Sequence, residues 1–288
     1  MARITSRTLL VTLLGAFARR TDHWMQISSI VGLLDALEVE ESSVRTGVSR
    51  LKKRKWLIAE RRGGRSGYRL TDVAKRSLLE GDKVIWHARE PAMLEDGWCI
   101  ASFSIPETQR ARRHLLRSRL ASLGFGNVGA GVWIAPARMH AEASNLIDAL
   151  DLAEYTNLFV GQHRGGQDLQ AMVRSSWDLE DIDASYRTFV TGHADDIALL
   201  DSMQGAQVPQ REAFIRYMRT LDDWRMLPMR DPGLPRELLP ENWAGDEAAR
   251  VLERIVAELD APALAFVHST LEGNSISLPE IDALALAG

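Results

Sequence analysis

Residues 41–57 read ESSVRTGVSRLKKRKWL, and this stretch decides the fold of the first third of the chain. Its apolar side chains recur at helical spacing and share one face of a helix, at Val44, Val48 and Leu51. Ser42 or Ser43 is expected to cap the helix start, because a short hydroxyl accepts a free backbone N–H there. The opposite face carries cations and hydroxyl groups, namely Ser43, Arg45, Thr46, Ser49, Arg50, Lys52 and Lys53. Arg and Lys neutralise phosphates, and Arg also grips base edges, so this face predicts DNA contact. Many basic helical faces are simply solvated, and the flanking segments decide between the two interpretations.

Those flanking segments have the pattern of a winged helix-turn-helix. Apolar residues at helical spacing predict helices over Ser6–Ala18 and Ile27–Leu37 before the basic helix. Strands are expected over Trp56–Glu60 and Tyr68–Leu70, around a glycine-rich turn at 61–67. Thr71 is expected to cap the helix that follows. The arginines of this hairpin are predicted to reach phosphates or a minor groove beside the helix, at Arg61, Arg62, Arg65 and Arg69. For the hairpin taken alone, an ordinary surface turn is the alternative.

Charge is unevenly distributed along the 288 residues. Residues 1–80 contain 16 Lys and Arg against 8 Asp and Glu, a net +8, whereas residues 81–288 contain 19 against 31, a net −12. This asymmetry predicts a module for a polyanion joined to an acidic body. The single cysteine, Cys99, excludes a disulfide framework within the chain and favours a reducing, cytoplasmic location. No apolar stretch is long enough to suggest a membrane span.

The rest of the chain predicts an α+β protein with two further domains. A linker at 83–96, expected to be a helix or an extended connector that ends near Pro91, separates residues 1–82 from a domain at 97–168. Strands and helices are expected there in β-α-β-β-α-β order, which is typical of a ferredoxin-like, Cas2-like sandwich of one sheet and two helices. They lie at Trp98–Ile105, Glu107–Leu123, Phe125–Val128, Gly131–Ile134, Ala141–Leu152 and Tyr155–His163. Gly124 is expected to end the first of these helices. Residues 169–288 read as a helical C-terminal domain, with a closing helix over Gly245–Leu259.

Several stretches resemble the PaaX-like family, which are repressors of phenylacetic acid degradation. SSVRTGVSRLKKRKWL at 42–57 and ERRGGRSGYRLT at 60–71 resemble its reading head, and LGFGNVGAGVWIAP at 123–136 resembles its middle domain. LPMRDPGLPRELLPENWAG at 227–245 resembles its C-terminal domain and is the most specific match. The resemblance implies a bacterial, cytoplasmic and dimeric repressor that binds double-stranded operator DNA and answers to an aromatic acyl-CoA, typically phenylacetyl-CoA. A dimer would space two reading helices about 34 Å apart and bind a near-palindrome.

The candidate effector-binding residues are cationic or aromatic. They are Arg112 and Arg113 on the expected 107–123 helix, His163 and Arg164 after the last strand, and Trp177. Arginine forks suit the phosphates of a CoA thioester. The arginines of the helix could instead touch DNA or form a solvated face. Trp177 is expected on one long helix with Tyr186, where an aromatic is more often core than pocket wall.

No catalytic, cofactor or metal-binding site is predicted. The histidines show no i, i+4 pair and no HExxH motif, and Cys99 lies in an apolar strand where a thiol is inert. A Cas2-like nuclease would need a carboxylate at the end of the first middle-domain strand, but that strand reads WCIASFSI. Three alternatives stay open from sequence: such a nuclease, a DNA-binding activator without acyl-CoA response, and a scaffold or toxin–antitoxin protein.

Overall fold

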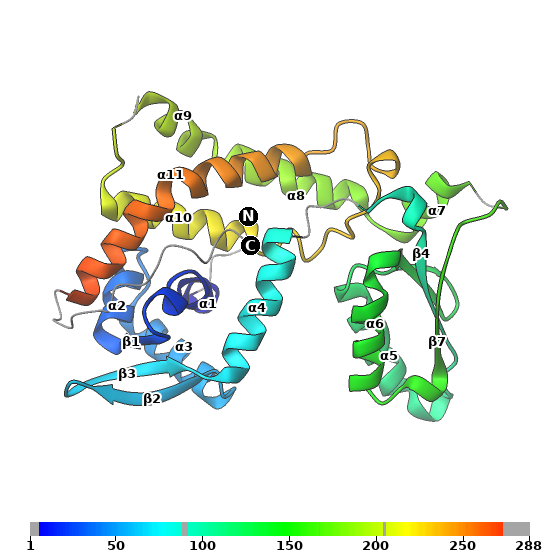
Figure 1. The fold of residues 1–288 in the computed structure, drawn as a ribbon, viewed down its shortest axis with the longest axis horizontal. Coiled ribbons are helices and arrows are strands. Elements are labelled where there is room, and N and C mark those ends of the chain that lie inside the picture. The colour runs from blue at the N-terminus through cyan, green and yellow to red at the C-terminus, as the bar shows by residue number, and fades with distance from the viewer. Residues whose placement is uncertain (1–5, 88–91, 167, 204–205, 273–288) are drawn as a thin grey trace. The chain divides into compact units, whose positions relative to one another are not determined.

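The computed structural model describes residues 6–87, 92–166, 168–203 and 206–272 (Figure 1). Its contacts divide the chain into two compact units, and neither follows the sequence continuously. One unit consists of Met1–Asp82, Val190–Trp224 and Arg250–Gly288, and the other of Lys83–Phe189 and Arg225–Ala249, as far as these ranges are described. The predicted helical domain at 169–288 therefore contributes segments to both units. Pro91, the expected end of the linker helix, lies outside the described residues.

The first unit opens with α-helices and a three-stranded antiparallel sheet of order β1-β3-β2. Its elements are α1 (Ser6–Phe17), β1 (Trp24–Gln26), α2 (Ile27–Asp35), α3 (Glu41–Lys53), β2 (Leu57–Arg62), β3 (Arg65–Leu70) and α4 (Asp72–His87). The three predicted N-terminal helices are confirmed, and leucines of α1 are fully buried as expected. Helix α4 ends at His87 and so extends into the segment at 83–96 that was expected to be a linker.

Helix α3 begins differently from the prediction. Glu40, not Ser42 or Ser43, is the N-cap residue, and no side chain caps it. The Glu40 carbonyl already accepts the N–H of Val44 at 3.1 Å, so both serines lie within the first turn. The predicted cap of α4 is confirmed, because the Ala74 N–H donates to Thr71 Oγ1 at 3.2 Å.

The β2–β3 hairpin is tighter than the predicted seven-residue turn. Only Gly63 and Gly64 connect the strands, with φ of 53° and 78°. Two successive positive φ values fit a two-residue turn of the mirror-image type, which suits glycine and the twist of a hairpin. Arg61, Arg62 and Arg65 therefore lie in paired strands, with Arg62 opposite Arg65. The expectation that they occupy a loop was wrong.

Strand β1 was not predicted, because three residues are too short to show an alternating pattern. Its register places Gln26 opposite Gly67 on β3. A Cβ at Gly67 would lie 2.5 Å from the Trp24 ring and 2.6 Å from the Met25 carbonyl oxygen. Glycine at this position therefore lets β1 close the sheet.

Helices from the C-terminal part of the chain complete the core of the first unit. They are α9 (Ala194–Ser202), α10 (Gln210–Trp224) and the later part of α11 (Gly245–Glu272). Phe17 of α1 packs against Phe214 and Tyr217 of α10, with ring centroids 5.8 and 5.7 Å apart. The buried Thr12 hydroxyl donates to Asp222 at 2.7 Å. Helix α11 continues past the predicted end at Leu259, with Pro262 inside it.

A buried ionic cluster lies between α8 (Leu179–Gly192) and α9, at His193. Its ring is 4% exposed, with Nδ1 2.7 Å from Asp196 and Nε2 3.4 Å from Asp223. Asp196 also pairs with Arg216 of α10. Burial alone lowers the pKa of His193, but its bonds to the two carboxylates outweigh burial and raise the pKa to about 9.

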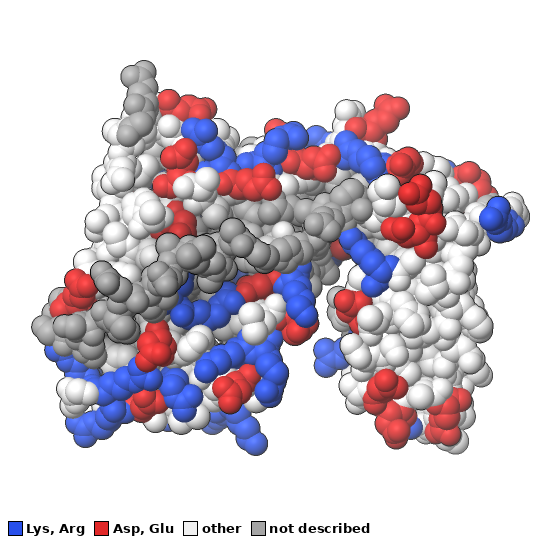
Figure 2. Space-filling view, in the orientation of Figure 1, with Lys and Arg blue, Asp and Glu red and all other residues white. Residues whose placement is uncertain are grey.

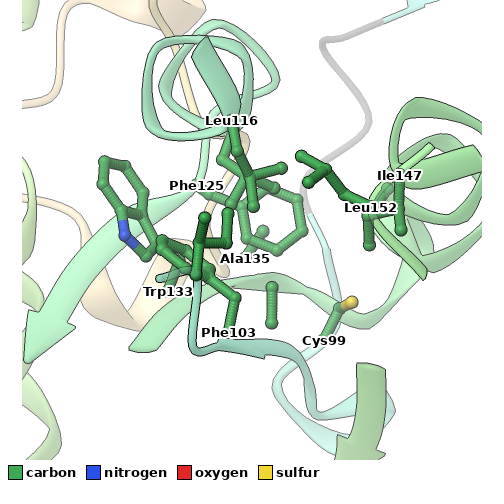
Figure 3. Packing of buried hydrophobic residues seen from close by; sticks show 12 residues of the cluster. Cys99, Phe103, Leu116, Phe125, Trp133, Ala135, Ile147 and Leu152 are labelled. Atoms are coloured by element: carbon green, nitrogen blue, oxygen red, sulfur yellow. The ribbon is translucent and has the colours of Figure 1, made fainter. Parts of the chain in front are cut away.

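The second unit contains the predicted β-α-β-β-α-β order, which is confirmed. Its elements are β4 (Trp98–Phe103), α5 (Arg110–Ser122), β5 (Gly126–Gly129), β6 (Val132–Pro136), α6 (His140–Ala149) and β7 (Thr156–Gly161), followed by α7 (Leu169–Ser176). The strands form an antiparallel sheet of order β5-β6-β4-β7. Helices α5 and α6 lie beside this sheet (Figure 1) and share one hydrophobic core with it (Figure 3). Cys99 is fully buried there, and burial raises the pKa of its thiol to about 11, which agrees with the predicted inert cysteine.

Helix α5 buries only a narrow face. Leu116 and Leu120 are fully buried, whereas Ala111 and Leu115 are exposed. Gly124 has φ of 84° and ends the helix as predicted, since the Phe125 N–H donates back to the Leu120 carbonyl at 3.0 Å. Most of the surface of α5 is therefore available to solvent.

Candidate nucleic-acid interface

Helix α3 separates an apolar face from a basic face. Val44, Val48 and Leu51 are at most 5% exposed. Gly47 permits a close approach to α1, since a Cβ there would lie 3.1 Å from Leu10 Cδ2. We call the opposite side the basic face of α3. It consists of Arg45, Thr46, Ser49, Arg50, Lys52 and Lys53, which are all exposed, with Ser43 half-buried at its margin.

The cations of this basic face differ in how strongly the protein engages them. Arg45 is held by Glu41, with Nε 2.6 Å from the carboxylate. Lys52 lies over the Tyr68 ring of β3, with Nζ 5.7 Å from the centroid. Arg50 and Lys53 have no ion-pair partner within the described residues. These two side chains are therefore the most available for an external anion, and Lys52 links the helix to the hairpin.

The hairpin arginines divide into a paired set and an available set. Arg62 and Arg69 each donate to Glu60 at 2.6 Å, and their bonds lower the pKa of that carboxyl. Arg61 is exposed and donates to the Gly64 carbonyl at 3.0 Å. Arg65 is half-buried, and its buried Nη1 lacks a hydrogen-bond partner within the described residues. Of the four predicted wing contacts, Arg61 and Arg65 have no salt bridge among the described residues and can therefore donate to a phosphate without breaking one.

Sequence reasoning missed the role of Glu60 in this arrangement. Arg62 is two residues along the same strand, and the register places Arg69 one diagonal step away on β3. A two-residue Gly63–Gly64 turn fixes that register, so assuming the shorter turn would have brought the three side chains onto one face. The hairpin arginines would then have separated into two classes from sequence alone.

Basic side chains gather on one side of the first unit. Figure 2 shows Lys and Arg over the part of the surface formed by α3 and the β2–β3 hairpin. The hairpin begins four residues after α3 ends, and the segment between them contributes the exposed Arg54 and Lys55. Helix and hairpin therefore present a predominantly cationic surface, with a few acidic side chains within it, that suits a polyanion.

The candidate effector residues on α5 are engaged by the protein. Arg112 donates to the carbonyl oxygens of Leu150, at 3.1 Å, and of Asp151, beyond the end of α6. Arg113 donates to Glu107 at 2.5 Å and to the Ile105 carbonyl at 3.3 Å. Both guanidinium groups thus hold the ends of elements in the second unit. A role in effector binding stays a prediction for each.

The other candidate effector residues lie on different elements. His163 is half-buried and Arg164 is exposed, both just after β7. The prediction that Trp177 shares one long helix with Tyr186 was wrong, because residue 177 is extended between α7 and α8. Its Nε1 donates to the Gly124 carbonyl at 2.9 Å, and its ring lies 6.3 Å from that of Trp98. These contacts give Trp177 a packing role against the sheet.

Comparison with known proteins places the whole arrangement in one family. Three family models match in order: "PaaX-like protein" over residues 5–74, "PaaX protein central Cas2-like domain" over 91–173, and "PaaX-like protein C-terminal domain" over 177–269. The chain belongs to the PaaX-like family. A family relative, the transcriptional repressor PaaX of Escherichia coli (strain K12), is 28% identical over 279 residues, which cover 96% of this chain and 87% of the relative.

A solved structure shares the fold of this PaaX-like chain. The uncharacterized protein Rv0674 from Mycobacterium tuberculosis matches with a TM-score of 0.61 and 20% identity, covering 92% of this chain and 98% of that one. Within residues 6–272 as described, no three His, Cys, Asp or Glu side chains group as metal ligands would. None of the described helices combines the length and apolar character that a bilayer span requires.

Proposed function

We propose that this PaaX-like chain is a transcriptional repressor that binds operator DNA through a winged helix-turn-helix. In this proposal α3 is the recognition helix and the β2–β3 hairpin is the wing. The observation that carries it is that α3 has a buried apolar face and, on the other side, exposed Arg50 and Lys53 that have no ion-pair partner among the described residues. Arg61 and Arg65 extend the same charge onto the hairpin. A cationic surface that the fold itself does not neutralise suits the phosphates of a duplex.

The proposed contacts follow from the chemistry of the side chains. Arg50 and Lys53 would meet base edges and nearby phosphates, with the exposed hydroxyls of Thr46 and Ser49 beside them. Arg61 and Arg65 would meet phosphates or the adjacent minor groove. The chain would act as a cytoplasmic homodimer and bind a near-palindrome with half-sites one helical turn apart or a multiple of one turn.

We further propose release of the repressor by an aromatic acyl-CoA such as phenylacetyl-CoA. The central domain, with its ferredoxin-like strand order, and the C-terminal helices would bind the effector and form the dimer. Arg112, Arg113, His163, Arg164 and Trp177 remain the candidate contacts. Effector and operator would favour different arrangements of the dimer, so each would weaken the binding of the other by the same factor.

Fluorescence anisotropy on the chain's own promoter region tests this function. The proposal expects binding that exceeds binding to scrambled DNA, that weakens with added salt, and that phenylacetyl-CoA reverses, with free CoA as the control. Binding that no thioester reverses would favour an activator without acyl-CoA response. No binding to promoter DNA would reject the proposal in favour of a protein partner. DNA cleavage that depends on divalent metal and stops with EDTA would instead indicate a nuclease.

A further inference from the structure

Helix α5 concentrates positive charge that the proposed reading head does not explain. Its sequence, RARRHLLRSRLAS, contains five arginines and no acidic residue in 13 positions. Residues 81–288 as a whole carry a net charge of −12, so this helix is a strong local exception. Because Leu116 and Leu120 form its buried side, the arginines lie around the remaining surface.

Structural contacts account for only part of this charge. Arg112 and Arg113 hold the ends of neighbouring elements, as described above. Arg110 and Arg117 are exposed, and neither has a hydrogen-bond or ion-pair partner among the described residues. With the exposed His114 they follow i, i+4, i+7 spacing, which places all three on one side of the helix over about 10 Å. We call these three residues the α5 strip.

Among the described residues, no ion pair stabilises the cations at these positions, and none of them lies in the last turn of α5, where the helix dipole favours positive charge. Arg110 opens α5, where the helix dipole disfavours positive charge, and the first turn contains no acidic residue. Arg113 lies three residues from Arg110 and four from Arg117, so the like charges repel along the helix surface. Arg119 differs, because it lies in the last turn of α5, where the dipole favours a cation. The α5 strip is therefore the part of the positive charge of α5 that the contacts within the fold do not explain.

We propose that Arg110, His114 and Arg117 bind backbone phosphates of DNA outside the bases that α3 reads. This inference rests on the proposed repressor function. A long polyanion suits the α5 strip because all three side chains lie on the exposed, convex surface of one helix. Small ligands such as a CoA thioester are usually held in concave sites that bury most of their surface. Contacts of this kind would strengthen binding without regard to sequence.

The test compares two double variants of the full chain by anisotropy with long promoter DNA. R110Q/R117Q removes two charges from the α5 strip. R119Q/R174Q removes the same charge from exposed positions of the same unit outside the strip. For R110Q/R117Q we expect the log–log salt dependence to become shallower by between about 1 and 2, since each phosphate contact contributes about 0.9. The loss of DNA affinity in R110Q/R117Q should be equal on promoter and scrambled DNA and absent in the control variant. R110K/R117K should bind as wild type does.

The possible outcomes separate the two proposals. Wild-type protein that does not bind its promoter rejects the repressor function, and the α5 strip proposal falls with it. If wild-type protein binds its promoter, and R110Q/R117Q binds with the same affinity and salt dependence as R119Q/R174Q, the α5 strip proposal alone is rejected. If R110Q/R117Q keeps its DNA affinity but is no longer released by phenylacetyl-CoA, the strip serves the thioester, and DNA contact is likewise rejected. Lysine variants that fail to restore binding would show that charge is not the cause.

Discussion

Replacing His193 by Gln should remove a pH-dependent contribution to stability. The unfolded-state pKa is near 6.5 and the folded-state pKa is about 9, because Asp196 and Asp223 outweigh the effect of burial. A raised folded-state pKa stabilises the protein fully below pH 6.5, and that stabilisation is lost as the pH rises through 9. The difference between the two pKa values corresponds to about 3 kcal/mol in the free energy of unfolding, at about 1.4 kcal/mol per pH unit.

Urea unfolding of wild type and H193Q between pH 6 and pH 10 measures this contribution. The difference between the two proteins should be largest at pH 6 and should shrink by about 3 kcal/mol towards pH 10. The measurements stop at pH 6 because Asp196 has a lowered pKa. The stabilising effect of Asp196 is therefore lost only in more acidic solution, outside this range. A matched control is H114Q, since His114 is exposed on α5 and has no ionic partner among the described residues.

Direct titration of the imidazole gives an independent value. NMR of protein with labelled histidine identifies the His193 resonance by its absence in H193Q. A titration midpoint near 9 supports the ionic cluster. A midpoint at or below 6.5, or a difference in unfolding free energy that stays constant from pH 6 to pH 10, would refute the reasoning.

Two further changes test the hairpin and the middle sheet. E60Q removes a carboxylate that Arg62 and Arg69 share. Arg62 keeps its ion pair with Asp22, so Arg69 is the arginine that is released. DNA affinity should rise and the salt dependence should steepen by about 0.9; anisotropy checks this, and an affinity equal to or below wild type would contradict it. G126A would place a Cβ 2.6 Å from the Trp177 ring and 2.8 Å from Ser176 Cβ, so it should destabilise the second unit by about 1–3 kcal/mol in thermal or urea unfolding. G129A, where nothing lies within 4 Å, is the control, and equal stability of the two variants would count against the packing role of Trp177.

Hydrophobic periodicity was enough to predict many of the regular elements, because it reports burial within each element. The helices α1 to α3 and the β-α-β-β-α-β order of the second unit were found in this way. Hydrophobic periodicity does not indicate contacts between distant parts of the chain. The bond between Thr12 and Asp222 joins residues 210 positions apart and draws α10 into the core beneath α1. No local pattern indicates that C-terminal helices complete the N-terminal unit.

The helix and the hairpin of the candidate interface were predicted from sequence, whereas the contacts of their side chains were not. From the sequence alone, Arg45, Arg50 and Arg62 are equivalent cations. Their availability depends on neighbours that the fold supplies, namely Glu41 for the first and Glu60 for the last. The Gly63–Gly64 turn could have been recognised from sequence, since paired glycines favour a two-residue hairpin. The ring contact between Lys52 and Tyr68 depends on packing of helix against sheet, which sequence does not specify.

Charge reversal at Arg50 and Lys53 of α3 tests the central claim most directly. R50E/K53E should fold as wild type does, since both side chains are exposed and neither has an ion-pair partner among the described residues. Each lost contact should weaken binding by about 1–3 kcal/mol, so affinity for promoter DNA should fall by at least about 30-fold in anisotropy. The control R119E/R174E makes the same charge change elsewhere and should bind within about two-fold of wild type, on the scale of a surface change away from the interface. Wild-type affinity in a folded R50E/K53E protein would contradict the account.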